Sequence, residues 1–153
     1  MAAPEGQELQ ERIDAVLKTL YLLFNEGYSS SNPDHLIRED VCAESIRLCS
    51  LLTQQVLTRF PGTFALLSLF SVQASRLQAR LDDYGHIIIL KYQDRSKWNR
   101  SLIQKRFDYL EMAAEPFEIS AYHLEAAIAS IHAASPSFEK TDWKSIYHLY
   151  ELL

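Results

Sequence analysis

Apolar residues recur at intervals of three and four along almost the whole chain, which is the pattern of amphipathic α-helices. The first such stripe consists of Ile13, Val16, Leu17, Leu20 and Phe24. Leu22 and Leu23 widen this stripe, so we expect the first helix to be buried on more than one side. The helix is predicted to end at Gly27, where glycine would adopt the left-handed conformation of a helix C-terminus.

Two more helices are predicted before residue 82. The second runs from about Leu36 to Thr58, and its inner face carries Val41, Ile46, Cys49, Leu52 and Val56. Pro61 and Gly62 are predicted to break it. The third runs from about Thr63 to Leu81, and its inner face carries Leu66, Leu67, Phe70, Ala74 and Leu77.

The pattern changes after the third helix. Asp82, Asp83 and Gly85 form a turn signal, and the run of isoleucines at 87–89 is β-branched and too short for a helix. We interpret this stretch as an extended excursion, with a short β-hairpin near residues 84–92 as an alternative.

Three capping residues predict the remaining helices. Asp94 is the expected N-cap of a fourth helix that ends near Ala114. Ser120 is the expected N-cap of a fifth, and Thr141 or Asp142 of a sixth that runs to the C-terminus.

The fold class predicted from these elements is all-α, with about six antiparallel helices in helix-hairpin or tetratricopeptide-like packing. We divide the 153 residues into three parts. Residues 1–9 are a disordered or tag-like N-terminus. Residues 10–92 are a helical linker domain of three helices and the extended excursion. Residues 93–153 are the start of a tetratricopeptide-like repeat array that is truncated at its C-terminus.

The repeat signal is degenerate. Trp143, Ile146 and Tyr150 meet three positions of a tetratricopeptide consensus, but 45 residues separate Trp98 from Trp143, where the consensus period is about 34. The last helix has no polar cap, although terminal repeats normally carry one. Its surplus of apolar side chains predicts a homodimer through this helix, with contacts from Trp143, Tyr147, Tyr150 and Leu153.

Composition and charge describe an ordinary cytoplasmic protein. The chain is 48% hydrophobic, has two cysteines, and carries no signal peptide or apolar run long enough to span a membrane. The formal net charge of −5 argues against a free-standing nucleic-acid-binding module. Residues 76–106, however, carry 8 positive and 3 negative side chains. This basic block is either a solvated surface or a contact for an acidic partner.

The sequence contains no pattern typical of catalysis. The five histidines lack metal-ligand spacing, and there is no nucleophile motif or glycine-rich phosphate loop. Cys42 and Cys49 lie two helical turns apart, so their α-carbons are about 10 Å apart and cannot share a disulfide. We therefore expect two buried cysteines, no metal, no cofactor and no enzyme activity.

Two polar clusters are the candidate interaction sites. The first consists of Asn25, Glu26, Tyr28, Arg38, Glu44 and Arg47, and the second of Asp94, Arg95 and Trp98. In the first, side chains three and four apart on the second helix are spaced for ion pairs. Both clusters fit helix caps and interhelical salt bridges, and both also fit a cleft for a peptide or small molecule.

Several segments in order resemble one known family. These are YLLFNEGYSSS at 21–31, REDVCAESIRL at 38–48, QDRSKWNRSLI at 93–103 and the stretch 121–153 with AYHLEAAIASIHA and TDWKSIYHLYELL. The chain resembles, over about residues 10–153, the C-terminal helical extension of bacterial extracytoplasmic-function-type sigma factors of the sigma-70 family. In members of that family, two helical regions that bind DNA and polymerase come first, and the extension with its tetratricopeptide-like repeats follows them.

The resemblance implies a non-catalytic regulatory domain that modulates transcription initiation. Its expected partners are the sigma regions of the same full-length protein, core RNA polymerase or an auxiliary protein. The chain lacks a basic recognition helix, so we expect no direct DNA binding and no membrane contact. The alternative is a free-standing ligand-sensing domain that binds a small molecule between helices one, two and four, with Glu26, Arg38 and Arg47 as polar groups.

Overall fold

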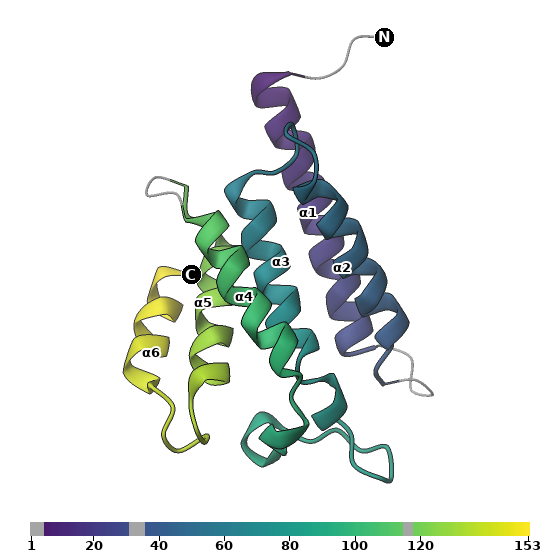
Figure 1. The fold of residues 1–153 in the computed structure, drawn as a ribbon, viewed down its shortest axis with the longest axis vertical. Coiled ribbons are helices and arrows are strands. Elements are labelled where there is room, and N and C mark those ends of the chain that lie inside the picture. Colours follow the sequence, from purple (N-terminus) through teal and green to yellow (C-terminus); the bar gives the residue numbers. More distant parts are fainter. Residues whose placement is uncertain (1–4, 31–35, 115–117) are drawn as a thin grey trace. The chain divides into compact units, whose positions relative to one another are not determined.

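The computed structural model describes residues 5–30, 36–114 and 118–153. These residues form six α-helices and contain no strand (Figure 1). The α-helices are α1 (Gly6–Tyr28), α2 (Glu39–Thr53), α3 (Pro61–Ala74), α4 (Arg100–Ala113), α5 (Ala121–Ala134) and α6 (Trp143–Leu152). Three short 3-10 helices are η1 (Leu77–Ala79), η2 (Leu90–Tyr92) and η3 (Arg95–Lys97). The prediction of an all-α fold with about six helices is confirmed.

The chain divides into two compact units, Met1–Arg59 and Phe60–Leu153. The first contains α1 and α2, and the second contains α3 to α6. The sequence instead suggested a boundary between residues 92 and 93, which falls inside the second unit. The reason is that α3 packs against both α4 and α5, so it belongs with the helices that follow it.

In the first unit, a single stripe of α1 contacts α2. The stripe consists of Ile13, Leu17, Leu20 and Phe24, all buried. Val16 and Leu22 are exposed, so the expectation of burial on more than one side is wrong. Helix α1 begins at Gly6, so residues 6–9, expected to be disordered, are helical, whereas residues 1–4 lie outside the described part of the chain.

Helix α2 is shorter than the apolar pattern suggested. It ends at Thr53 instead of Thr58, and Val56, expected on its inner face, is exposed beyond its end. Its buried face consists of Cys42, Ser45 and Cys49. Pro33, expected to open the second helix, lies outside the described residues.

Gly27 allows α1 and the start of α2 to touch. It lies inside α1, which continues to Tyr28, and it has no positive φ, so the predicted left-handed C-cap is wrong. A Cβ at Gly27 would lie 2.9 Å from both the Arg38 carbonyl oxygen and the Cys42 backbone nitrogen. The Arg38 N–H also donates to the Gly27 carbonyl at 2.6 Å. Glycine is therefore required for the close approach of two backbones.

Helix α3 is the centre of the second unit and is buried on all sides. Pro61 opens this helix instead of only ending the previous one, because proline suits a first turn that needs no N–H donor. Leu66, Leu67, Phe70 and Ala74 are buried as predicted. Helix α3 ends at Ala74, so Leu77 lies in η1.

The segment after η1 is a loop without strands. One isolated antiparallel bridge joins Leu81 to Ile87, and the Asp82 N–H donates to the His86 carbonyl at 2.9 Å. Ile87 and Ile89 are exposed, so they lack a packed face that would stabilise paired strands. The β-hairpin alternative is therefore wrong, and the extended interpretation holds only up to η2.

Four side chains cap the helices that follow. Asp94 accepts from the Ser96 N–H and caps η3, so it is not the cap of α4. Asn99 caps α4 by accepting from the Leu102 N–H at 3.1 Å. Ser120 caps α5 as predicted, and Asp142, not Thr141, caps α6.

Candidate functional site

The first polar cluster resolves into separate surface pairs on the first unit. Arg38 donates to Asp40 at 2.9 Å, and Arg47 binds both carboxylate oxygens of Glu44 at 2.8 and 2.6 Å. These hydrogen bonds hold the pKa of Asp40 and of Glu44 below their ordinary values. All four side chains are exposed, and such pairs contribute little to stability.

The other members of this cluster lie at the end of α1. Asn25 and Glu26 are exposed, and Tyr28 is half-buried with its ring stacked on Phe24 at 5.8 Å. Glu26, Arg38 and Arg47, the polar groups expected of a ligand pocket, all face solvent.

The second polar cluster reaches from the surface of the second unit into its core: Asp94 is exposed, Arg95 is half-buried and Trp98 is buried. Trp98 is 3% exposed. The Arg95 guanidinium carbon lies 4.4 Å from the centre of the Trp98 ring, and its Nη1 donates to the carbonyls of His132 and Ser135 at 2.9 and 3.1 Å. Arg95 therefore connects η3 to the C-terminal end of α5 through hydrogen bonds. Exposed Asp94 holds η3 in place, and its hydrogen bonds from Ser96 lower its pKa.

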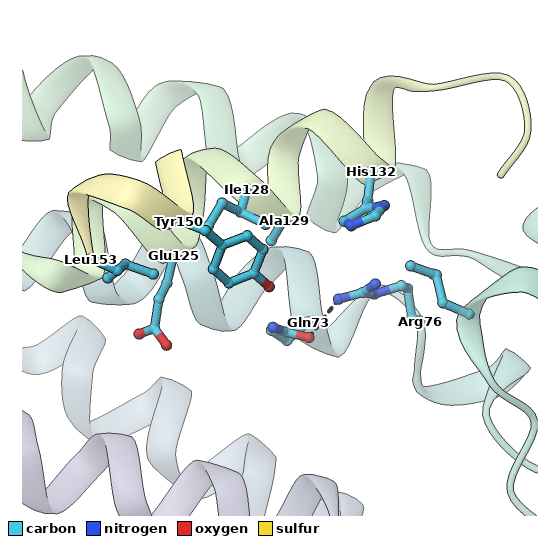
Figure 2. A pocket seen from close by; sticks show the side chains of 9 residues that line it. Gln73, Arg76, Glu125, Ile128, Ala129, His132, Tyr150 and Leu153 are labelled. Atoms are coloured by element: carbon cyan, nitrogen blue, oxygen red, sulfur yellow. Dashed lines mark hydrogen bonds between the residues drawn. The ribbon is translucent and has the colours of Figure 1, made fainter. Parts of the chain in front are cut away.

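A pocket of about 250 Å³ lies beside this cluster, between α3, α5 and the end of α6 (Figure 2). Its polar lining residues are Gln73, Arg76, Glu125, His132 and Tyr150. Its apolar lining residues are Leu90, Ile128, Ala129 and Leu153. In Figure 2 the guanidinium of Arg76 lies between the amide of Gln73 and the ring of His132.

Two arginines lie at or near one end of this pocket, and Glu125 lines its other end. Among the described residues, no ion pair includes Arg76 or Arg95. Burial lowers the pKa of Arg95, and Arg76 and Arg100 lower it further against the opposing effect of Glu139. Burial also lowers the pKa of His132, and Arg76 and Arg95 add to this effect. His132 is therefore neutral near pH 7.

Reasoning from the sequence named Tyr150 and Leu153 only as dimer contacts and missed the other pocket residues. Arg76 belongs to the basic block 76–106, but nothing in the sequence places Arg76 near His132, 56 positions away. The one available signal was the excess of positive charge in a segment that also carries buried apolar residues.

The outer side of α6 is a second candidate surface. Ile146 is its one buried residue, whereas Tyr147 and Leu152 are 64% and 70% exposed. Trp143 packs edge-on against Phe138 and His132 with ring centres 4.8 and 5.3 Å apart, and it remains 43% exposed. Tyr150 and Leu153 are also exposed, but they line the pocket, and the ion pair of His148 with Glu151 lies on the outer side. Helix α6 therefore has several exposed apolar side chains without one continuous apolar face.

Cys42 and Cys49 are buried and share no disulfide, as predicted. Burial raises the pKa of Cys49 to about 12, so its thiol is protonated and unreactive near neutral pH. Within the described ranges, no group of three or more His, Cys, Asp or Glu side chains is placed to hold a metal ion. No helix in the same ranges is both long enough and apolar enough to cross a bilayer.

Comparison with known proteins assigns the chain to a family. A family model described as "Family of unknown function (DUF6596)" matches residues 12–114. The chain is 37% identical over 150 residues to an uncharacterized protein of Rhizobium meliloti (strain 1021), and the alignment covers 98% of this chain and 35% of that protein. The chain thus spans about a third of that relative's length. No solved structure matches the chain. On the extent of the family match, this protein belongs to DUF6596, a family of unknown function.

Proposed function

We propose that this chain is a non-catalytic regulatory and protein-interaction region of an alternative RNA polymerase sigma factor. The observation that carries the proposal is the number of exposed apolar side chains at α6: Trp143, Tyr147, Tyr150, Leu152 and Leu153 are all at least 43% exposed. Several large apolar side chains exposed on one short helix are typical of a protein contact. The resemblance of residues 10–153 to sigma-factor extensions indicates which partner to expect: the sigma regions of the same longer protein, or core polymerase.

The length of the Rhizobium relative supports a role within a larger protein. This chain aligns with 35% of that relative, so most of the relative consists of other segments. A helical region that shares a chain with further segments has partners available at high effective concentration.

The DNA that flanks the coding segment gives the first test. An open frame that continues upstream into two basic helical regions, and downstream into further helix pairs, supports the proposal. A stop codon just upstream of Met1 overturns it, because the chain would then have no sigma regions to regulate.

Substitution of the α6 surface in the full-length protein is expected to reduce transcription. Tyr147→Ser combined with Leu152→Ser should lower transcription from a cognate promoter about tenfold. The pair removes the two most exposed apolar side chains of α6. Neither side chain is buried, so circular dichroism should remain unchanged. Arg95 and Trp98 are unsuitable for this test because they are part of the core.

Val56→Ser combined with Leu57→Ser is the matched control, because both residues are exposed large hydrophobics outside α6. This pair should leave transcription unchanged. An equal loss of transcription in both double variants, or no loss of transcription in the α6 double variant, would contradict the proposal.

The same surface is expected to make the isolated chain self-associate. Light scattering at high protein concentration should report a dimer, and Tyr147→Ser with Leu152→Ser should restore the monomer. We regard such a dimer as a substitute for the native contact. A monomer at every protein concentration would show that the exposed apolar side chains of α6 do not cause self-association.

A second candidate is a ligand-sensing domain, and the pocket between α3, α5 and α6 favours it. All residues that line this pocket belong to the second unit, whereas Glu26, Arg38 and Arg47, the polar groups that the sequence suggested, belong to the first. A thermal-shift screen against metabolites separates the candidates, because a bound ligand raises the melting temperature by mass action.

A further inference from the structure

We propose that the pocket beside Arg76 binds a small monocarboxylate with a short apolar body. This inference gives the ligand class for the ligand-sensing candidate, on which it rests, and is independent of the sigma-factor proposal. It depends on two features of the second unit: the cation Arg76, which lines the pocket without an ion pair among the described residues, and the apolar walls that the pocket also has.

The charge at the polar end calls for an anion. Arg76 is 8% exposed, lines the pocket and takes part in no ion pair among the described residues. Arg95 takes part in no ion pair in this part of the chain either, and both guanidiniums lie near the ring of Trp98, at 4.4 Å for Arg95 and 5.9 Å for Arg76. The charge of Arg95 adds to that of Arg76, and an anion bound at Arg76 would offset both.

The hydrogen bonds at this end are incomplete. Arg76 donates to the Gln73 side-chain oxygen, but its Nε has no acceptor. Its hydrogen bond to Gln73 uses one of the five N–H donors of the guanidinium, so further donors remain for a ligand in the pocket that Arg76 lines. A carboxylate offers two acceptor oxygens, which match the planar donors of a guanidinium.

The opposite end of the pocket selects for a single charge and an apolar body. Figure 2 shows Gln73, Arg76 and His132 at one end, Leu153 and Glu125 at the other, and Tyr150 between them with its hydroxyl toward Gln73. Leu153, Ile128 and Ala129 supply apolar walls. Glu125 disfavours a second negative charge on the ligand. The volume of about 250 Å³ limits the ligand to a small molecule.

Titration with 4-methylpentanoate, followed by amide and side-chain NMR shifts, tests the inference. We expect saturable shifts at Gln73, Arg76 and His132. Arg76→Met keeps the side-chain length but removes the charge, and it should weaken binding at least about tenfold. Lys105→Met makes the same change of charge at an exposed site on α4 and should leave binding unchanged.

A second variant, Glu125→Gln, distinguishes a loss of the ligand contact in Arg76→Met from a loss of folding. This nearly isosteric change removes a negative charge from the pocket wall, so it should tighten binding about threefold. Opposite signs for the two variants cannot arise from general destabilisation.

Two probes set the ligand class. Inorganic phosphate should bind more weakly than 4-methylpentanoate, and 4-methylpentylamine should not bind. Tighter binding of phosphate, or equal affinity in wild type and Arg76→Met, would overturn the carboxylate assignment. If neither anion binds but another metabolite stabilises the protein in the thermal-shift screen, the ligand class is wrong and the ligand-sensing candidate stands.

Discussion

Trp98→Ala is expected to destabilise the second unit by about 4 kcal/mol, the typical cost of removing a buried large aromatic side chain. Trp98 is 3% exposed, so its removal leaves a cavity. The Arg95 guanidinium, 4.4 Å from the ring centre, loses a cation–π contact worth about 1 kcal/mol of this total. The loss should appear in urea denaturation followed by circular dichroism as a lower midpoint.

Trp143→Ala is the matched control, because the chain has only two tryptophans. Trp143 is 43% exposed and packs on one side alone, so its loss should cost about 1 kcal/mol. Similar losses for the two variants would mean that Trp98 does not hold the core together. The result also decides how to interpret the second polar cluster, since a large loss assigns Trp98 to stability.

Gly27→Ala should destabilise the α1–α2 unit by about 2 kcal/mol, although glycine to alanine within a helix ordinarily stabilises by about 1 kcal/mol. The sign is reversed because the new Cβ would lie 2.9 Å from two backbone atoms, the Arg38 oxygen and the Cys42 nitrogen. Neither atom can move without separating the start of α2 from α1.

Amide hydrogen exchange in α1 and α2 measures this effect within the first unit. Asn25→Ala is the control, since Asn25 is exposed on the same helix. In this variant, the free energy of opening that amide exchange reports for α1 and α2 should change by less than about 0.5 kcal/mol. Increased protection in Gly27→Ala would show that the two helices can separate at no cost.

Helix existence was predictable from the sequence, whereas helix ends and faces were less so. The three-and-four spacing of Ile13, Leu17, Leu20 and Phe24 predicts the buried stripe of α1. The same rule included exposed Val16, because periodicity does not define how wide a buried stripe is. Asp94 and Asn99 are both good caps, and no local pattern indicates that a 3-10 helix lies between them.

Tertiary contacts determine the features that the sequence did not predict. A glycine near the predicted end of a helix fits a left-handed C-cap. Only the close approach of α2 shows that Gly27 has a different role, which is to leave room for the α2 backbone. The candidate pocket joins α3, α5 and α6, so its residues are separated by about fifty positions or more in some pairs, such as Arg76 and His132. Local pattern analysis detects spacings within one helix and therefore found Glu44 with Arg47, but not Arg76 with His132.

The unequal anchoring of α3 and α6 has a kinetic consequence for the pocket that both helices line. Helix α3 buries ten of its side chains and α6 buries one, so α6 detaches at a far lower free-energy cost than α3. A bound molecule would therefore leave when α6 opens, and its residence time would follow the packing of Ile146 and Trp143 more than the strength of its contact with Arg76. Substitutions on α6 would then change the dissociation rate while the charged end of the pocket stays intact.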